Sequence, residues 1–196
     1  MPVLKKENQM SVKELKICKI RNVKTPTRAN PTDAGMDFFI PYDLLRTDMA
    51  KTFEITHPTV NGRSPSPQID YDYNTGYVKT IFLRPGDEIL IKTGIKVNVP
   101  EGYVLKIENK SSISTRKGLL VGAGIVDPGF MGEIMINLHN VSNWKTAVLQ
   151  PGDKIAQGVL YPIETPAITE IETAEELYKG KNSERGEGGF GSSGQR

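Results

Sequence analysis

The sequence predicts an all-β fold, and three observations support this prediction. Most of the 196 residues fall into short, β-prone apolar runs that are separated by turn residues. The chain contains 19 glycines and 13 prolines, which favour turns and loops over long helices. Only two short stretches have the composition of a helix. Many short strands at turn spacing are typical of a β sandwich or a jelly roll.

The predicted strands follow one another along almost the whole chain. Their ranges are ELKICKIRNV (14–23), MDFFIP (36–41), EILIKTGIKVNVPEGYVLKIEN (88–109, with a turn at 100–102), GEIMINLHNVS (132–142), WKTAVL (144–149) and KIAQGVLYPIE (154–164). The tripeptide PGD precedes a strand twice, at 85–87 and 151–153, where Pro and Gly favour a tight turn and Asp can bond its own backbone. The two candidate helices are SSISTRKG (111–118) and TAEELYKG (173–180).

The chain length suggests one domain with additions. Residues 1–24 form a basic arm with the first strand, and residues 25–181 form a single β domain. Within it, residues 46–80 have little apolar periodicity, so we interpret them as an inserted loop or an extra hairpin. Residues 182–196 are rich in glycine and serine and cannot fold by themselves, which indicates a flexible C-terminal tail.

Composition excludes several classes of protein. The net charge of +2 gives no strong attraction to nucleic acid or membranes, so neither is an expected partner. A single cysteine excludes an intrachain disulfide, and no apolar run approaches 18 residues, so we expect an intracellular, cytoplasmic protein. Two histidines and one cysteine cannot build a Cys/His zinc site. The glycine patterns of P-loop and Rossmann nucleotide-binding folds are absent.

Small polar clusters along the chain are the remaining candidates for chemistry. Lys110 precedes Ser111 and Ser112 at the start of the predicted helix, where amides, hydroxyls and an ammonium can bind an anion. Taken alone, the same cluster can also be interpreted as an ordinary helix N-cap without a ligand. The stretch 121–133 has glycines that let the backbone approach a ligand, with one carboxylate, Asp127, although alone it is an ordinary hairpin.

The C-terminal tail carries groups that suit a phosphorylated, planar ligand. Arg185, Ser192 and Ser193 suit phosphates, and Phe190 can stack on a base. Glycines between them allow the segment to close over a ligand and exclude water. We therefore interpret the tail as a lid, whereas alone it would be a disordered terminus.

Five motifs occur in the order of one known family. They are AGMDF (34–38, motif 1), NKSSISTRKG (109–118, motif 2), VGAGIVDPGFMGEI (121–134, motif 3), PGDKIAQ (151–157, motif 4) and RGEGGFGSSG (185–194, motif 5). In these motifs the chain resembles the homotrimeric dUTP pyrophosphatases, or dUTPases, of the dUTPase/dCTP deaminase superfamily. One motif alone is a weak signal, but five in order are a strong one.

The resemblance implies a fold and an activity. The fold would be a dUTPase-like distorted jelly roll (β-clip), assembled as a homotrimer with a swapped C-terminal segment. Each site would take residues from three subunits. The reaction would be hydrolysis of dUTP to dUMP and pyrophosphate by water attack at the α-phosphorus, which keeps dUTP out of DNA and supplies dUMP for thymidylate synthesis. Mg²⁺ would be the cofactor, held by substrate phosphates and waters with no direct protein ligand.

The resemblance also implies roles for particular residues. Asp127 would act as the general base, and Asp37 would support motif 2 from behind. The backbone of motif 3 would recognise uracil, Phe130 would pack against deoxyribose, and lysine, serine and glutamine side chains would hold phosphates. The implied substrate-binding residues are Lys110, Ser111, Ser112, Ala123, Gly124, Ile125, Phe130, Met135, Gln157, Arg185, Phe190, Gly191, Ser192 and Ser193.

The sequence departs from the family pattern in three places, and one supports an alternative activity. Lys110 stands where the family usually has Arg, and Phe130 where it usually has Tyr. The sequence DPGF resembles dCTP deaminases, so a deaminase or bifunctional deaminase/dUTPase is the first alternative. That pattern has a catalytic Glu ten residues after the aspartate, where this chain has Asn137, which cannot act as a base. In a strand, Glu133 would share a face with Asn137.

A second alternative is a non-enzymatic class. The fold would serve a regulatory interaction protein that binds a protein partner through the 46–80 range, with or without catalysis.

Overall fold

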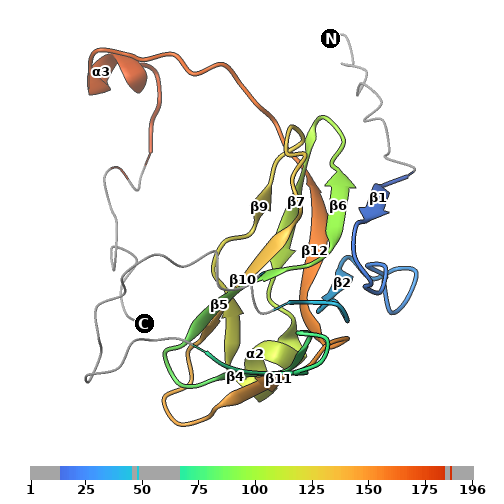
Figure 1. Ribbon diagram of the computed structural model, residues 1–196. Coiled ribbons are helices and arrows are strands. Elements are labelled where there is room, and N and C mark those ends of the chain that lie inside the picture. Colours follow the sequence, from blue (N-terminus) through green and yellow to red (C-terminus); the bar gives the residue numbers. More distant parts are fainter. Residues whose placement is uncertain (1–13, 46–47, 49–66, 184–185, 187–196) are drawn as a thin grey trace. The chain divides into compact units, whose positions relative to one another are not determined.

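The computed structural model describes residues 14–45, 48, 67–183 and 186, and within these it confirms an all-β architecture (Figure 1). Chain contacts divide the protein into two units, Met1–Glu164 and Thr165–Arg196. The described strands of the first unit are β1 (Lys16–Lys19), β2 (Met36–Phe39), β3 (Gln68–Tyr71), β4 (Val78–Leu83), β5 (Glu88–Lys92), β6 (Ile95–Asn98), β7 (Tyr103–Glu108), β8 (Leu119–Val121), β9 (Ile125–Val126), β10 (Met135–Asn140), β11 (Ala147–Leu149) and β12 (Lys154–Pro162). The helix α2 (Ser111–Lys117) lies between β7 and β8.

These strands pair antiparallel in four small sheets. The strand orders are β1-β6, β5-β10-β8, β11-β4-β3 and β2-β12-β7-β9. The last sheet joins motif 1 on β2 to motif 4 on β12, and it joins both to the strand that leads into motif 2. Pairing is irregular between Lys154 and Ala156, where the register against β2 shifts. Such a bulge rotates a side chain relative to the regular alternation of a strand.

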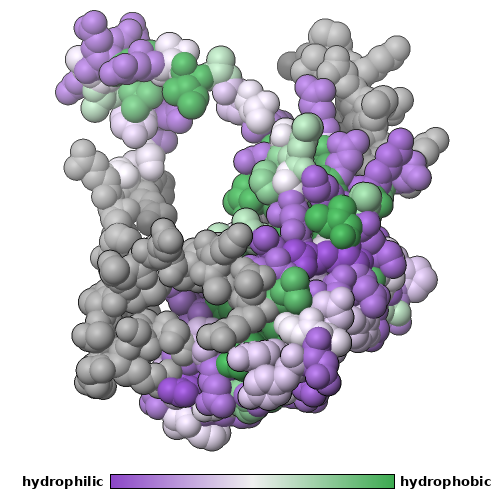
Figure 2. Space-filling model, in the orientation of Figure 1, coloured by the Kyte–Doolittle hydropathy of each residue, from purple (hydrophilic) through white to green (hydrophobic). Residues whose placement is uncertain are grey.

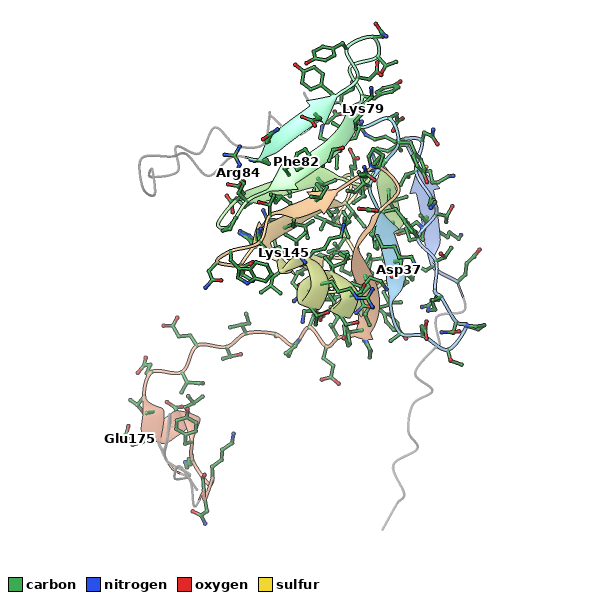
Figure 3. The ribbon with its side chains drawn as sticks, turned by 90° about the horizontal axis from the view of Figure 1, so that it is seen from below. Asp37, Lys79, Phe82, Arg84, Lys145 and Glu175 are labelled. Carbon is green, nitrogen blue, oxygen red and sulfur yellow. The ribbon has the colours of Figure 1, made fainter. Side chains whose placement is uncertain are left out.

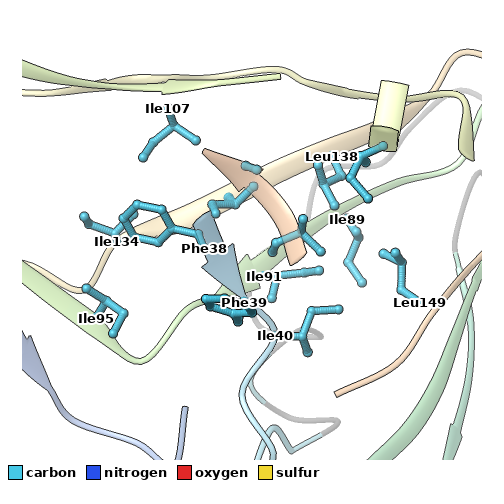
Figure 4. Close-up of a cluster of buried hydrophobic side chains, with 14 of the residues drawn as sticks. Phe38, Phe39, Ile40, Ile89, Ile91, Ile95, Ile107, Ile134, Leu138 and Leu149 are labelled. Atoms are coloured by element: carbon cyan, nitrogen blue, oxygen red, sulfur yellow. The ribbon is translucent and has the colours of Figure 1, made fainter. Parts of the chain in front are cut away.

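The core lies between these sheets and is built around β2. All four residues of β2 are buried, and Phe38 is completely inaccessible. Figure 4 shows Phe38 and Ile40 in one cluster with Ile91 of β5 and with Ile134, the residue before β10. A strand buried on both faces reads as a continuous apolar run, which is why MDFF has no polar alternation except at Asp37.

Both PGD turns have the predicted geometry. Gly86 and Gly152 have φ of 80° and 85°, which glycine adopts without strain. The carboxylate of Asp87 accepts the Arg84 N–H at 2.8 Å, and that of Asp153 accepts the Gln150 N–H at 3.1 Å. The aspartates therefore close the turns that start β5 and β12.

The range 46–80 contains a hairpin that belongs to the domain. Strands β3 and β4 pair with each other, and β4 pairs with β11. Val78 and Ile81 of β4 are buried in the core. Of the alternatives for this range, the hairpin is present at 68–83, while residues 49–66 lie outside the described residues.

The described part of the second unit contains a short helix, α3 (Ala174–Leu177), inside the range where a helix was predicted. The Thr173 hydroxyl accepts the Glu176 N–H at 3.1 Å, which caps the first turn. Gly180, at φ of 80°, ends this segment. Within the described chain no helix has both the length and the apolar character needed to span a bilayer.

The surface visible in Figure 2 is mostly polar, with small separate apolar areas. The large apolar side chains that are exposed in the described chain include Phe130, Met131 and Trp144. Two of these three belong to motif 3, which gives that loop an accessible apolar character.

Candidate active site

A cavity of about 470 Å³ brings together three of the predicted motifs. Its lining includes Gly35 and Asp37 of motif 1, Asn109 and Lys110 of motif 2, and Gln157 of motif 4. These residues are far apart in sequence and meet because β2, β7 and β12 are neighbours in one sheet. The cavity is therefore a product of the sheet order.

A buried carboxylate organises the cationic side of this cavity. Asp37 is 4% exposed and lies between two ammonium groups. Its Oδ1 is 2.7 Å from Lys110 Nζ, and its Oδ2 is 2.7 Å from Lys154 Nζ. Burial favours a raised pKa for Asp37, but hydrogen bonds from the two lysines outweigh it and hold this pKa below its usual value. One carboxylate thus fixes two positive charges, leaving an excess of one for an anion.

Gln157 is held in place by motif 2. Its amide Nε2 donates to the Asn109 carbonyl at 3.0 Å, and the Asn109 side chain accepts the Val121 N–H at 2.7 Å. A Cβ added at Gly35 would lie 2.3 Å from Gln157 Oε1. Gly35 is therefore the residue that leaves room for the glutamine side chain.

Helix α2 presents Ser111 and Ser112 directly after Lys110. Ser111 is exposed and Ser112 is half-buried. The other end of the helix is anchored, because Lys117 Nζ donates to the Val148 carbonyl and lies 3.1 Å from Asp153 Oδ2. Gly118 ends the helix in the left-handed conformation at φ of 69°. The two serines are thus placed by a helix that is fixed at its C-terminal end.

The backbone of motif 3 follows β7 closely. The Ile107 N–H donates to the Gly124 carbonyl at 2.7 Å, and β9 continues this pairing. A Cβ at Gly124 would lie 2.5 Å from the Ile107 carbonyl oxygen, so only glycine allows this approach. Ala123 and Ile125 on either side are exposed. The loop therefore offers accessible residues on a backbone that is fixed to the sheet.

The remaining predicted residues of this region are also accessible. Asp127 is exposed, Phe130 is 43% exposed and Met135 is 41% exposed. The Phe130 N–H donates to the Asp127 carbonyl at 3.1 Å, which closes a turn between the carboxylate and the ring. None of these three residues lines the cavity that contains Lys110. Within one chain, Lys110 and Gln157 therefore line a cavity that these three residues, and Ser111 and Ser112, do not line.

Comparisons with known proteins identify the family. A family model described as dUTPase matches residues 58–194. The deoxyuridine 5'-triphosphate nucleotidohydrolase of Hydrogenobaculum sp. (strain Y04AAS1) is 36% identical over 118 residues, 59% of this chain and 77% of the relative. That of Mycobacterium sp. (strain JLS) is 34% identical over 136 residues, 66% of this chain and 88% of the relative. The chain belongs to the dUTPase family. It is accordingly a dUTP diphosphatase, an enzyme that hydrolyses dUTP.

Solved structures agree with the fold of this dUTPase. The dUTPase of Staphylococcus bacteriophage 80alpha with dUPNHPP has a TM-score of 0.65 and 26% identity, covering 93% of this chain and 99% of that one. A mutant dUTPase from phage phi11 of S. aureus, described with a structural Mg(II) ion, has a TM-score of 0.57 and 25% identity, covering 83% and 99%.

The position expected for a deaminase base is an amide in this dUTPase. Asn137 lies on β10, and a Cβ at Gly122 would lie 2.1 Å from its Oδ1. Glu133 precedes β10 and does not lie in the strand, so the condition for a shared strand face with Asn137 is not met. Its Oε1 accepts the Gly94 N–H at 2.7 Å and lies 3.4 Å from Arg21 Nε. The nearest carboxylate in sequence is therefore already engaged.

Sequence reasoning did not select Lys154, Asn109 or Gly35 of this dUTPase as site residues. All three residues lie inside the five motifs, and the strongest signal was the lysine three residues before Gln157. The predicted residues Arg185, Phe190, Gly191, Ser192 and Ser193 lie outside the described residues. In the described part of the chain no three His, Cys, Asp or Glu side chains gather as a metal site.

Proposed function

We propose that this dUTPase hydrolyses dUTP to dUMP and pyrophosphate by water attack at the α-phosphorus, with Asp127 as general base. The observation that carries the proposal is the Asp37–Lys110 ion pair beside Gln157 in one cavity, with Lys154 bound to the same carboxylate. Fixed ammonium groups that face an open cavity suit a phosphate chain, because no reorganisation is needed when the anion arrives.

On the phosphate side, Lys110 and Gln157 would donate to the oxygens, joined by the hydroxyls of Ser111 and Ser112. Lysine acts as a point charge and cannot form the two parallel bonds of arginine. Its fixation by Asp37 at 2.7 Å compensates, since the ammonium is already oriented. Lys154, held by the same carboxylate, adds a second positive charge near this position.

On the nucleoside side, the backbone at Ala123, Gly124 and Ile125 would recognise the uracil edge. Backbone donors and acceptors discriminate against cytosine because a wrong base leaves them unpaired. The exposed ring of Phe130 would pack against deoxyribose where a ribose hydroxyl would otherwise sit, with Met135 beside it. Their exposure makes them available to a ligand.

Asp127 would orient the attacking water and accept its proton. The carboxylate is exposed in the loop that carries Phe130, so water can reach it. No covalent intermediate is needed, because the water itself forms the new bond to phosphorus while the bond to the leaving pyrophosphate breaks.

The residues fit a magnesium ion that is carried by the substrate. Mg²⁺ is a hard cation that keeps several waters and binds phosphate oxygens readily. The cavity lining offers the Lys110 ammonium and the Gln157 amide to the phosphate oxygens, beside the carboxylates of Asp33, Asp37 and Glu108. When bound, the ion would neutralise charge that develops on the phosphate oxygens.

We also propose a homotrimer with shared sites. The separation of the Lys110 cavity from Asp127 and Phe130 within one chain supports this arrangement. A neighbouring copy would supply motif 3, and the tail of a further copy would supply Arg185, Phe190, Gly191, Ser192 and Ser193 as the lid. The cytoplasm, where deoxynucleotides are made, is the proposed location.

Pyrophosphate release with Mg²⁺ tests this function, with dUTP, dTTP, dCTP and UTP offered in parallel. The proposal predicts release from dUTP alone. Release from UTP would contradict the role of Phe130, and ammonia release from dCTP would restore the deaminase alternative despite Asn137.

A second candidate function is binding of a protein partner, and the β3–β4 hairpin favours it. Tyr73 is 92% exposed, and its ring is 5.3 Å from that of Tyr71. Figure 3 shows Lys79 on this hairpin, well separated from Asp37. Exposed tyrosines are enriched in binding surfaces. Tyr73→Ser would remove this exposed ring and keep both strands of the hairpin, and unchanged dUTP hydrolysis with loss of a captured partner would support this candidate.

A further inference from the structure

A cluster of ion pairs outside the cavity connects three distant segments. The guanidinium of Arg21, just after β1, donates to Asp48 with Nη1–Oδ2 at 2.6 Å and Nη2–Oδ1 at 2.9 Å. On its other side, Arg21 Nε lies 3.4 Å from Glu133 Oε1. The three side chains are only 14–19% exposed. Such a bidentate, partly desolvated arginine holds its geometry better than an exposed ion pair does.

The carboxylate of Glu133 is also bonded to the backbone. Its Oε1 accepts the Gly94 N–H at 2.7 Å, in the turn between β5 and β6. The Gly94 carbonyl in turn accepts the Ile20 N–H at 2.8 Å. Gly94 has φ of 71°, and a Cβ there would lie 2.7 Å from Arg21 Cβ. Glu133 therefore binds Gly94, the residue of the β5–β6 turn that also bonds to Ile20 beside Arg21.

The anchored glutamate stands at the end of the loop that carries Asp127 and Phe130. Ile134, the next residue, is fixed by both of its backbone groups. Its N–H donates to the Ile95 carbonyl at 2.8 Å, and its carbonyl accepts from the Thr93 N–H and hydroxyl at 3.1 and 2.7 Å. Two consecutive residues, Glu133 and Ile134, thus fix the C-terminal end of this loop by hydrogen bonds.

The Phe130 ring lies close to the anchor. A Cβ at Gly132 would lie 2.5 Å from the ring atom Cζ of Phe130. The ring therefore packs over the residue that immediately precedes Glu133. A rotation of the chain at Glu133 would move Gly132 and hence the ring above it.

Positive and negative groups face one another in the cluster, so each group depends on the others. Arg21 and Lys92 oppose Asp48 and Glu133, with Lys92 Nζ 3.7 Å from Asp48 Oδ1. The hydrogen bond to Asp48 raises the pKa of Arg21, and the same bond lowers the pKa of Asp48. Removal of one partner would leave a partly buried charge without compensation, which costs more than the pair itself contributes.

We infer that Glu133 is a positioning residue for the reaction: held by Gly94 and Arg21, it fixes the loop that presents Asp127 and Phe130. Arg21 ties this loop to Asp48, so residues that precede the 49–66 segment help to set the geometry of the site. The inference rests on the proposed roles of Asp127 and Phe130. Displacement of a catalytic group by about 1 Å can cost a factor of about 100 in rate.

Three variants test the inference through kcat and through the affinity for the dUTP analogue dUPNHPP. Glu133→Ala removes both contacts and should lower kcat about ten- to a hundredfold, with affinity for the analogue changed less than about threefold. Glu133→Gln keeps an acceptor for the Gly94 N–H and should recover most of that loss. Arg21→Met should lower kcat in the same direction, and its combination with Glu133→Ala should add little, because the two residues act as a unit.

Controls separate the possible failures. Glu101→Ala removes an exposed carboxylate from the turn before β7 and should leave kcat unchanged. If Asp127→Asn keeps near-normal activity, the proposed mechanism is wrong and this inference with it. If Asp127→Asn is inactive while Glu133→Ala retains wild-type kcat, only the positioning role is overturned. If Glu133→Ala does not fold, Arg21→Met decides. Reduced kcat with intact analogue binding in Arg21→Met supports the inference, and wild-type kcat in that variant overturns it.

Discussion

Replacement of Asp37 by asparagine is the perturbation with the clearest structural magnitude. The variant keeps the shape of the side chain but removes the charge that two ammonium groups share. Asp37 is 4% exposed, with Lys110 and Lys154 each at 2.7 Å. Two positive charges would then face each other across a neutral amide, so we expect the folded state to lose stability.

The expected cost lies between two limits. Breaking a fully buried pair costs about 3–5 kcal/mol, whereas exposed pairs contribute about 0–1 kcal/mol. The lysine side chains are 24% and 45% exposed, so they can turn partly toward water and reduce the penalty. We therefore expect a loss of about 2 kcal/mol. For a chain of this size that lowers the midpoint of thermal unfolding by about 4–8 °C.

The pH dependence distinguishes this cause from a packing defect. The pKa of Asp37 is lower in the folded state than in the unfolded chain, where it is about 3.9. The carboxylate therefore stabilises the fold above about pH 4, and this contribution is lost as the pH falls through the lower, folded-state pKa. The difference between wild type and Asp37→Asn should be full at pH 7 and should shrink on acidification.

Thermal unfolding at a series of pH values measures both effects at one fixed protein concentration. Asp70→Asn is the matched control, because it makes the same chemical change at an exposed position on β3. It should leave the midpoint unchanged at pH 7. A midpoint for Asp37→Asn equal to that of wild type at neutral pH, or a difference that does not shrink as the pH falls below about 4, would refute the electrostatic account.

Two further variants probe the cavity and the core. Gly35→Ala places a Cβ 2.3 Å from Gln157 Oε1, so the amide must leave its hydrogen bond to Asn109. We therefore expect KM for dUTP to rise about tenfold. An unchanged KM would mean that Gln157 does not bind the substrate. Phe38→Ala empties a completely buried position on β2 and should cost about 3–5 kcal/mol in denaturant unfolding, whereas a loss below about 1 kcal/mol would mean that the core there is not as packed as described.

Much of the fold follows from local sequence signals. Each strand predicted by apolar runs contains a strand, and both PGD turns carry the glycine conformation and aspartate bond that the tripeptide predicts. The range 46–80 was harder, because β3 has only four residues and exposes Gln68 and Asp70, while β4 exposes Lys79. Ile81 is buried where β4 pairs with the distant strand β11, and the Val78 N–H donates to the distant Leu44 carbonyl. Local sequence patterns do not indicate either contact.

The site was predictable in its motifs but not in its contacts. Asp37 was expected behind motif 2, and it bonds Lys110 there. Lys154 was missed because it is three residues from Gln157, and a regular strand would place the two on opposite faces. The shift of register between Lys154 and Ala156 brings both beside Asp37. The alternation of apolar and polar residues along a strand does not predict such a bulge, so the positions of these two side chains are known only from the structure.

The most direct test of the account concerns Asp127. Wild type and Asp127→Asn are compared for pyrophosphate release from dUTP with Mg²⁺ and for binding of dUPNHPP. The account predicts that the variant binds the analogue with nearly wild-type affinity and that its turnover is lost, because an amide cannot accept the proton of the attacking water. Turnover near the wild-type rate in Asp127→Asn would show that another group activates the water, and the proposed mechanism would be wrong.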